Sequence, residues 1–165
     1  MQQTDRRNAE NLAEAISGAT PRALQRFLTE APWDAAAVVD DLQAYVAERL
    51  SAPDAVFVLD ETGFPKQGTK SVGVARPSCG ALGKIGNCQV GVFLAYTSLL
   101  GTALVDHRLY LPDRWAGDRP RRAAAGVPPD IAFATKAELG LAMLRQVRTR
   151  GELVGRWLTA DEHYG

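Results

Sequence analysis

The first fifty residues carry apolar positions with a helical period. Three helices are predicted: Asn8–Ser17, a second opened by Thr20 and Pro21, and a third capped by Asp34. A threonine before a proline is typical of a helix start, because its hydroxyl accepts an orphan backbone N–H and proline lacks a donor. The third helix has an apolar residue at every fourth position, namely Val38, Leu42, Val46 and Leu50. This spacing predicts one buried stripe.

After residue 52 the pattern changes to that of strands. Continuous or alternating β-prone runs predict four of them: Ala55–Leu59, Gln89–Thr97, Ala103–Leu111 and Arg156–Ala160. A short turn separates the second from the third, which predicts a hairpin. A capping box at Thr135 opens a helix that ends near Gly151, before the fourth strand. Ser71–Ala75 is a candidate short strand, and Leu111–Pro129 is predicted to be irregular.

The order strand, strand, strand, helix, strand predicts an α/β chain with a mixed (α+β) sheet. It matches the first half of an RNase H-like fold, in which the first and fourth strands are central neighbours. Two domains are expected: a helical region over residues 1–52 and an incomplete RNase H-like domain over residues 53–165. The helical region is either a packed bundle or a helix-turn-helix-like DNA reader.

Two aspartates follow strands that should be neighbours. Asp60 comes directly after the first strand and Asp161 directly after the fourth. A carboxylate at the end of a buried strand needs a hydrogen bond, a counter-charge or a cation. Two such carboxylates side by side favour a divalent metal such as Mg²⁺, which prefers oxygen ligands. Glu61 and Glu162 follow the aspartates but should point to the other face, because strand side chains alternate.

Charge is distributed unevenly although the net charge is zero. Residues 1–61 contain eleven acids and five Lys or Arg, whereas residues 62–165 contain eight acids and fourteen Lys or Arg. The acid-free stretch from Thr62 to Val105 contains Lys66, Lys70, Arg76 and Lys84. Such a stretch is either a solvated loop or a binding site for a polyanion, because phosphate contacts release counterions.

Several other classes of function are not supported by the sequence. Gly80–Lys84 lacks the flanking Gly and Ser/Thr of a phosphate-binding loop. Cys79 and Cys88 have no nearby partners for zinc, and they are interpreted as idle or buried thiols. The polar start is not a secretory signal, and the longest apolar stretch is interrupted too often to cross a bilayer. We therefore expect no membrane partner and a cytoplasmic, nucleoid-associated location.

Long motifs along the chain resemble a group of bacterial insertion-sequence transposases of the DDE superfamily. The first covers Val58–Gly68 and contains Asp60, and the last covers Thr159–Gly165 and contains Asp161. Intermediate blocks include Ser71–Arg76, Arg108–Pro112 with Trp115, and Phe133–Lys136. The resemblance extends over nearly the whole chain.

This resemblance implies metal-dependent cleavage and joining of DNA at transposon ends. Asp60 and Asp161 are then the first two catalytic, metal-binding acids, with two Mg²⁺ or Mn²⁺ ions in the complete enzyme. Lys66, Lys70, Arg76, Lys84 and Arg108 are candidate DNA-binding residues. The implied partners are terminal inverted repeats, target DNA and further transposase subunits, as a homo-oligomer or with full-length transposase.

The family's third acid, a glutamate on a later helix, has no counterpart in these residues. We therefore expect a truncated copy that is inactive alone. The alternatives are a non-catalytic, regulatory DNA-binding fragment and an inactive gene remnant.

Overall fold

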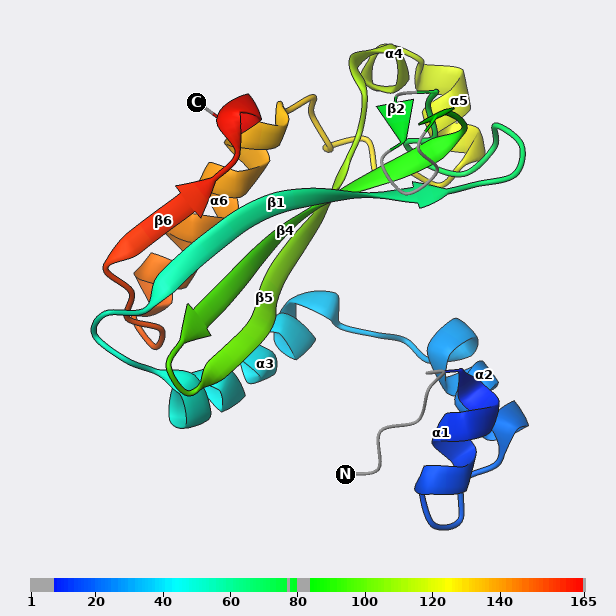
Figure 1. The fold of residues 1–165 in the computed structure, drawn as a ribbon. Coiled ribbons are helices and arrows are strands. Elements are labelled where there is room, and N and C mark those ends of the chain that lie inside the picture. Colours follow the sequence, from blue (N-terminus) through cyan, green and yellow to red (C-terminus); the bar gives the residue numbers. More distant parts are fainter. Residues whose placement is uncertain (1–7, 77, 80–83, 165) are drawn as a thin grey trace. The chain divides into compact units, whose positions relative to one another are not determined.

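The computed structural model of the chain describes residues 8–76, 78–79 and 84–164 (Figure 1). Residues 80–83 lie outside these residues, and they form most of the segment Gly80–Lys84 that was compared with a phosphate-binding loop above. The chain divides into two compact units, Met1–Val38 and Val39–Gly165. No described helix is both long enough and apolar enough to span a bilayer.

The first unit contains two helices, α1 (Ala9–Ala15) and α2 (Pro21–Glu30). The predicted start of α2 is confirmed, since the Thr20 hydroxyl accepts from the backbone N–H of Ala23 at 3.2 Å. Only Ala13 of α1 and no residue of α2 is buried. The rings of Phe27 and Trp33 meet edge to face at 4.4 Å and are both about half exposed.

The second unit is built on a mixed four-stranded sheet. Its strands are β1 (Val56–Pro65), β4 (Cys88–Ser98), β5 (Gly101–Tyr110) and β6 (Trp157–Ala160), in the order β5-β4-β1-β6. The β4–β5 hairpin is confirmed, and so is the adjacency of the first and fourth predicted strands, which run parallel. Two short strands, β2 (Ser78–Cys79) and β3 (Lys84–Ile85), pair with each other.

Strand β1 is longer than predicted. It continues past Leu59 to Pro65, because β4 pairs with it over the whole length from Val56↔Thr97 to Pro65↔Cys88. The parallel pairing with β6, by contrast, stops at Leu59↔Ala160. Asp60 therefore lies inside β1, at the point where its neighbour β6 ends. Ser71–Ala75 does not form the expected strand; it is a turn with one isolated bridge from Ala75 to Cys88.

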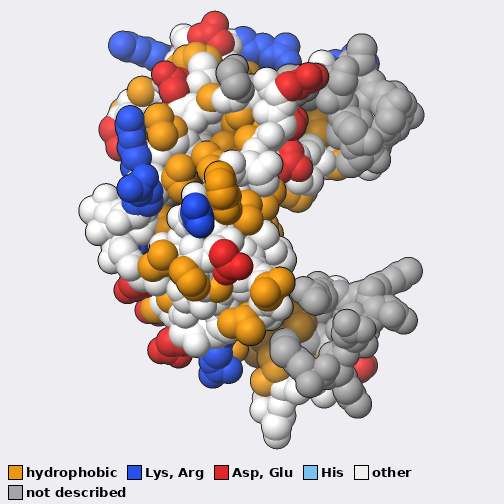
Figure 2. All heavy atoms as spheres, turned by 60° about the vertical axis from the view of Figure 1, so that its left-hand side comes forward, with side chains coloured by type: hydrophobic (Ala, Val, Ile, Leu, Met, Phe, Trp, Pro, Cys, Tyr) orange, Lys and Arg blue, Asp and Glu red, His pale blue; other side chains and the backbone are white. Residues whose placement is uncertain are grey.

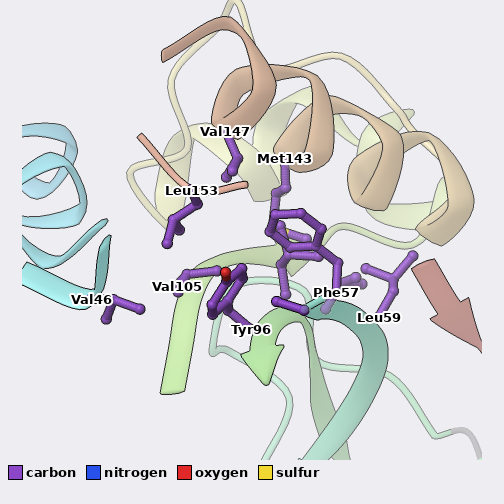
Figure 3. Packing of buried hydrophobic residues seen from close by; sticks show 11 residues of the cluster. Val46, Phe57, Leu59, Tyr96, Val105, Met143, Val147 and Leu153 are labelled. Atoms are coloured by element: carbon purple, nitrogen blue, oxygen red, sulfur yellow. The ribbon is translucent and has the colours of Figure 1, made fainter. Parts of the chain in front are cut away.

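Helix α6 (Lys136–Arg150) covers one face of the sheet, as Figure 1 shows. It begins at the predicted capping box and ends at Gly151, whose φ of 72° lies in the left-handed region that favours glycine. Met143 and Val147 of α6 point toward Phe57, Leu59 and Tyr96 of the sheet (Figure 3). These side chains form the main core of this unit.

One close approach in this core depends on a glycine. Leu59 packs against Gly140 of α6, where a Cβ would lie 2.8 Å from Leu59 Cδ1 and closer still to Cδ2. Real Cβ atoms do not approach so closely. Leu59, the residue before Asp60, therefore packs closely against the backbone of α6 at a position where a side chain would clash.

The capping box of α6 gives a stability prediction. We expect Thr135→Ala to lower the free energy of unfolding by about 1 kcal/mol, because the hydroxyl cap on the Glu138 N–H is lost. Hydrogen bonds from the Thr135 backbone N–H and hydroxyl lower the pKa of Glu138. The stabilisation from these hydrogen bonds is present above the usual pKa of glutamate and is lost as the pH falls through the lowered pKa of Glu138.

Urea unfolding at neutral and acidic pH measures both effects. The deficit of Thr135→Ala should shrink in acid, where Glu138 is protonated. Thr149→Ala, on the same helix, is the control, and its change should stay within about 0.5 kcal/mol. An equal deficit for the two variants contradicts the capping interpretation.

Helix α3 (Ala35–Leu50) begins at the predicted cap, Asp34, but only the second half of the predicted stripe, Val46 and Leu50, packs against the core. Val38 and Leu42 are 46% and 38% exposed, whereas Gln43 and Val46 are buried. The Gln43 amide donates to the carbonyl oxygen of Val105 at 2.9 Å, beside an irregularity in the β4–β5 pairing. The carbonyl of Val105 at this irregularity needs a donor, so a polar side chain of α3 is buried beside it.

The predicted irregular segment Leu111–Pro129 contains two short helices, α4 (Asp113–Ala116) and α5 (Arg119–Ala124). Trp115 of α4 is fully buried with Val74 and Leu111 in a second, separate apolar cluster. Its indole N–H donates to the carbonyl oxygen of Val74 at 2.8 Å. We call residues 66–76 together with residues 111–131 the α4–α5 lobe.

Candidate active site

Asp60 and Asp161 lie next to each other at the end of the β1–β6 pair. They directly follow Leu59 and Ala160, the last residues paired between these parallel strands. Neighbouring strands are about 4.8 Å apart, and laterally paired positions share a face. Both aspartates are exposed. The structure thus brings together the two acids that the sequence placed a hundred residues apart.

The edge position of β6 leaves this site open to solvent. All four residues of β6 are exposed, and Trp157 is 59% exposed. Figure 2 views the molecule from the side of β6 and α6 and shows apolar side chains at the surface among lysines and arginines. The apolar residues of these elements that reach the surface include Leu141, Trp157 and Leu158. A large substrate therefore has access to Asp161.

Glu61 belongs to the opposite face of β1 from Asp60. It pairs with Val92, a buried residue under α6, whereas Asp60 pairs with Phe93. The Glu61 carboxylate forms an ion pair with Lys136, the first residue of α6. It also accepts a hydrogen bond from the Tyr164 hydroxyl at 2.9 Å. Glu61 is therefore engaged beneath α6, on the face predicted to lie away from the aspartates.

Tyr164 connects this network to Asp161. It ends the short 3₁₀ helix η2 (Glu162–Tyr164), which begins directly after Asp161. Burial, the hydrogen bond to Glu61 and the negative charges of Glu61, Asp60 and Asp161 raise the pKa of Tyr164. The phenol thus stays protonated and donates to Glu61. The Glu61–Lys136–Tyr164 network joins β1, the start of α6 and the turn that carries Asp161.

Sequence reasoning did not single out Lys136 or Tyr164. A lysine at the first position of a helix is unfavourable beside the positive end of the helix dipole, and this could have indicated a buried acidic partner. Nothing in the sequence pattern shows that Tyr164 returns to Glu61. The side chain of His163, two residues after Asp161, lies outside the described part of the structure.

The other face of the sheet carries Asp60 together with aromatic rings. Phe93 pairs with Asp60 on one side and with His107 on the other. The Phe93 and His107 rings stack at 6.2 Å, and Phe64 meets Phe93 at 6.0 Å. His107 is an exposed strand residue in this row.

The candidate DNA-binding residues fall into two groups. Lys66, Lys70 and Arg76 are exposed in the α4–α5 lobe, and Lys84 lies in β3, its side chain outside the described part. Arg108 of β5 instead forms an ion pair with the buried Asp106 and donates to Gln146 of α6 at 2.8 Å. The side chain of Arg108 retains 35% exposure.

The carboxylates of Asp60 and Asp161 fit a divalent cation, since they offer exposed oxygen ligands from adjacent strand ends. They supply only part of a coordination shell. Among the described residues, no group of three or more His, Cys, Asp or Glu side chains is arranged to hold a metal ion. A Mg²⁺ ion bound there would need further ligands, which commonly include water and substrate oxygens.

Comparison with known families assigns the whole chain to one of them. The model of the DDE superfamily endonucleases matches residues 1–165, and the chain belongs to this family. The predicted family and the mixed α/β fold, a partial RNase H-like fold, are thereby confirmed.

Among curated proteins, the chain is similar to the probable transposase for insertion sequence element IS701 of Microchaete diplosiphon. The two are 27% identical over 97% of this chain. The matched region is 39% of the relative, so this chain spans about two fifths of that protein's length. No solved structure matches the chain.

Proposed function

We propose that this chain contributes part of the catalytic domain of an insertion-sequence transposase, which cuts and joins DNA at transposon ends. The observation that carries the proposal is the juxtaposition of Asp60 and Asp161 where β6 ends beside β1. The similarity to a probable insertion-sequence transposase supports it.

Asp60 and Asp161 would hold Mg²⁺ or Mn²⁺, two ions in the complete enzyme. Such ions polarise a phosphoryl oxygen and activate water or a 3′-hydroxyl. Within this chain, the Glu61–Lys136–Tyr164 network holds the turn after β6 against the start of α6. It thereby keeps Asp161 beside Asp60.

DNA is the proposed substrate, as terminal inverted repeats and as target. Lys66, Lys70 and Arg76 are exposed and suited to phosphate contacts, and Lys84 is proposed with them. Arg108 is the weakest member of this set, because Asp106 and Gln146 already occupy its guanidinium group. A homo-oligomer or a complex with longer transposase subunits is proposed as the active assembly, with the cell interior as its location.

Two carboxylates are too few to fix two ions in catalytic geometry. We therefore propose that these 165 residues alone bind the metal weakly and cleave DNA poorly or not at all. The isolated chain would still bind DNA. A regulatory DNA-binding role is therefore the second candidate function. The exposed cations of the α4–α5 lobe are the observation that favours it.

Metal binding tests the proposed site directly. Titration with Mn²⁺, followed by electron paramagnetic resonance, should give weak saturable binding to the chain. Asp60→Asn and Asp161→Asn should each weaken it roughly tenfold or more, because each removes one direct ligand. Glu162→Gln, which also removes one exposed charge beside Asp161, is the matched control and should change it little.

Equal binding by the wild type and both asparagine variants contradicts the site assignment. A parallel assay supplies duplex DNA with Mn²⁺ and looks for strand cleavage. Robust cleavage that Asp60→Asn abolishes would overturn the proposed inactivity of the isolated chain while supporting the site.

A further inference from the structure

The α4–α5 lobe combines cations from two segments that are distant in the sequence. Its basic residues are Lys66, Lys70, Arg76, Arg114, Arg119, Arg121 and Arg122, and its acids are Asp113, Asp118 and Asp130. All of these belong to the described residues. Five of the cations are exposed, namely Lys66, Lys70, Arg76, Arg114 and Arg119. The lobe therefore presents an excess of positive charge to solvent.

Arg121 holds the two segments of the lobe together. Its guanidinium lies 3.7 Å from the centre of the Trp115 ring and donates to the carbonyl oxygen of Thr69 at 2.8 Å. The Trp115 indole donates to Val74 in the same segment. The loop with Lys66 and Lys70 is thereby fixed to the helices that carry Arg114 and Arg119.

Two further charges of the lobe, Arg122 and Asp118, have internal roles. Arg122 donates to the carbonyl oxygens of Ala116 at 3.1 Å and Pro128 at 3.0 Å. Asp118 caps α5, accepting from the backbone N–H of Arg121 at 3.0 Å, so its negative charge faces the positive end of that helix. The two other acids, Asp113 and Asp130, are exposed, so five exposed cations of the lobe face two exposed acids.

Strand β1 connects the lobe to the aspartates. It runs without a break from Asp60 to Pro65, and Lys66 continues the pairing through its N–H to Asn87 at 2.8 Å. At about 3.3 Å per residue, Asp60 and Pro65 are roughly 17 Å apart. Duplex DNA rises about 3.4 Å per base pair, so this span corresponds to roughly five base pairs. Figure 1 shows β1 leading from the β6 side of the sheet to α4 and α5.

We propose that the α4–α5 lobe contacts the phosphate backbone of duplex DNA on the flank of the segment that lies at Asp60 and Asp161. Arg114 and Arg119 are phosphate-contacting residues in addition to Lys66, Lys70 and Arg76. The contact is electrostatic and independent of base sequence. This inference rests on the proposed function and deepens it by assigning a surface to the DNA.

The test measures binding of the full chain to a fluorescein-labelled duplex of arbitrary sequence by fluorescence anisotropy across a series of salt concentrations. The variant is Arg114→Ala with Arg119→Ala. Each lost phosphate contact should reduce the slope of log K against log salt by about 0.9, so the double variant should lose about 1.8. Its affinity at low salt should fall roughly tenfold or more.

The matched control is Arg145→Ala with Arg148→Ala, which removes two exposed arginines from α6. This control should keep the wild-type slope. If the wild type binds DNA and the lobe variant shows the same affinity and salt slope as the control variant, the lobe assignment is overturned and the proposed function stands. If the wild type does not bind duplex DNA even at low salt, the proposed function fails and the lobe assignment with it.

A competitor separates DNA from other polyanions. Poly-glutamate at equal charge should displace the labelled duplex less well than unlabelled duplex does, because its charges are not spaced as phosphates are. Equal displacement would mean that the lobe binds acidic polymers in general, and this outcome overturns the assignment to DNA.

Discussion

Trp115→Ala is expected to open the α4–α5 lobe and to remove about 3–5 kcal/mol of its stability. The indole is fully buried between Val74 and Leu111, and Arg121 lies over its ring. Its loss leaves a cavity and removes the donor from the Val74 carbonyl. The cluster around Trp115 is separate from the main core, so the sheet and α6 should stay folded.

Hydrogen exchange read by mass spectrometry resolves this local effect. Amides in residues 66–76 and 111–131 should lose protection, whereas those of β4 and α6 should keep it. Trp157→Ala is the control of the same residue type, because Trp157 is 59% exposed and its removal should change stability by less than about 1 kcal/mol. Unchanged protection in the lobe of Trp115→Ala contradicts the proposed role of this tryptophan.

Glu61→Ala is expected to weaken Mn²⁺ binding by roughly tenfold to a hundredfold, although Glu61 faces away from the aspartates. Without its carboxylate, Lys136 loses its ion pair and Tyr164 loses the acceptor of its hydroxyl. The turn carrying Asp161 is then no longer fixed to α6. Electron paramagnetic resonance of bound Mn²⁺ reports both the affinity and the heterogeneity of the site, so cleavage activity is not needed.

The control for this prediction is Glu162→Ala, which removes the same charge from the residue after Asp161. If Glu61 acted only through long-range charge, the two variants would weaken binding equally. Tyr164→Phe provides a second comparison, since it keeps the ring and removes only the hydroxyl. It should produce part of the Glu61→Ala effect, and a wild-type affinity would exclude Tyr164 from the network.

The sequence predicted the elements that local chemistry determines. The Thr135 capping box, the Thr20 and Asp34 caps and the β4–β5 hairpin all occur where short-range patterns placed them. The juxtaposition of Asp60 and Asp161 followed from the order of the elements. Each of these depends on a few neighbouring residues or on topology alone.

The features that sequence reasoning missed depend on tertiary partners. The end of β1 is set by the length of β4, which the residues after Leu59 do not reveal. The burial of Gln43 in α3 depends on the carbonyl of Val105, which lies sixty-two residues further along the chain. The pairing of Glu61 with Lys136 and Tyr164 likewise joins residues that are far apart in the sequence.

The packing of Leu59 against Gly140 places Leu59 on the α6 face of β1 and leaves Asp60 on the opposite face. A shift of β1 by a single residue would exchange Asp60 and Glu61 between the faces of the sheet. A shift that brought Glu61 into the place of Asp60 would set a longer carboxylate beside Asp161, put Thr62 opposite Lys136 and move Asp60 to the position of Leu59 against Gly140. Gly140, a residue with no side chain, therefore helps to keep Asp60, the proposed metal ligand, in place from inside a helix on the other face of the sheet.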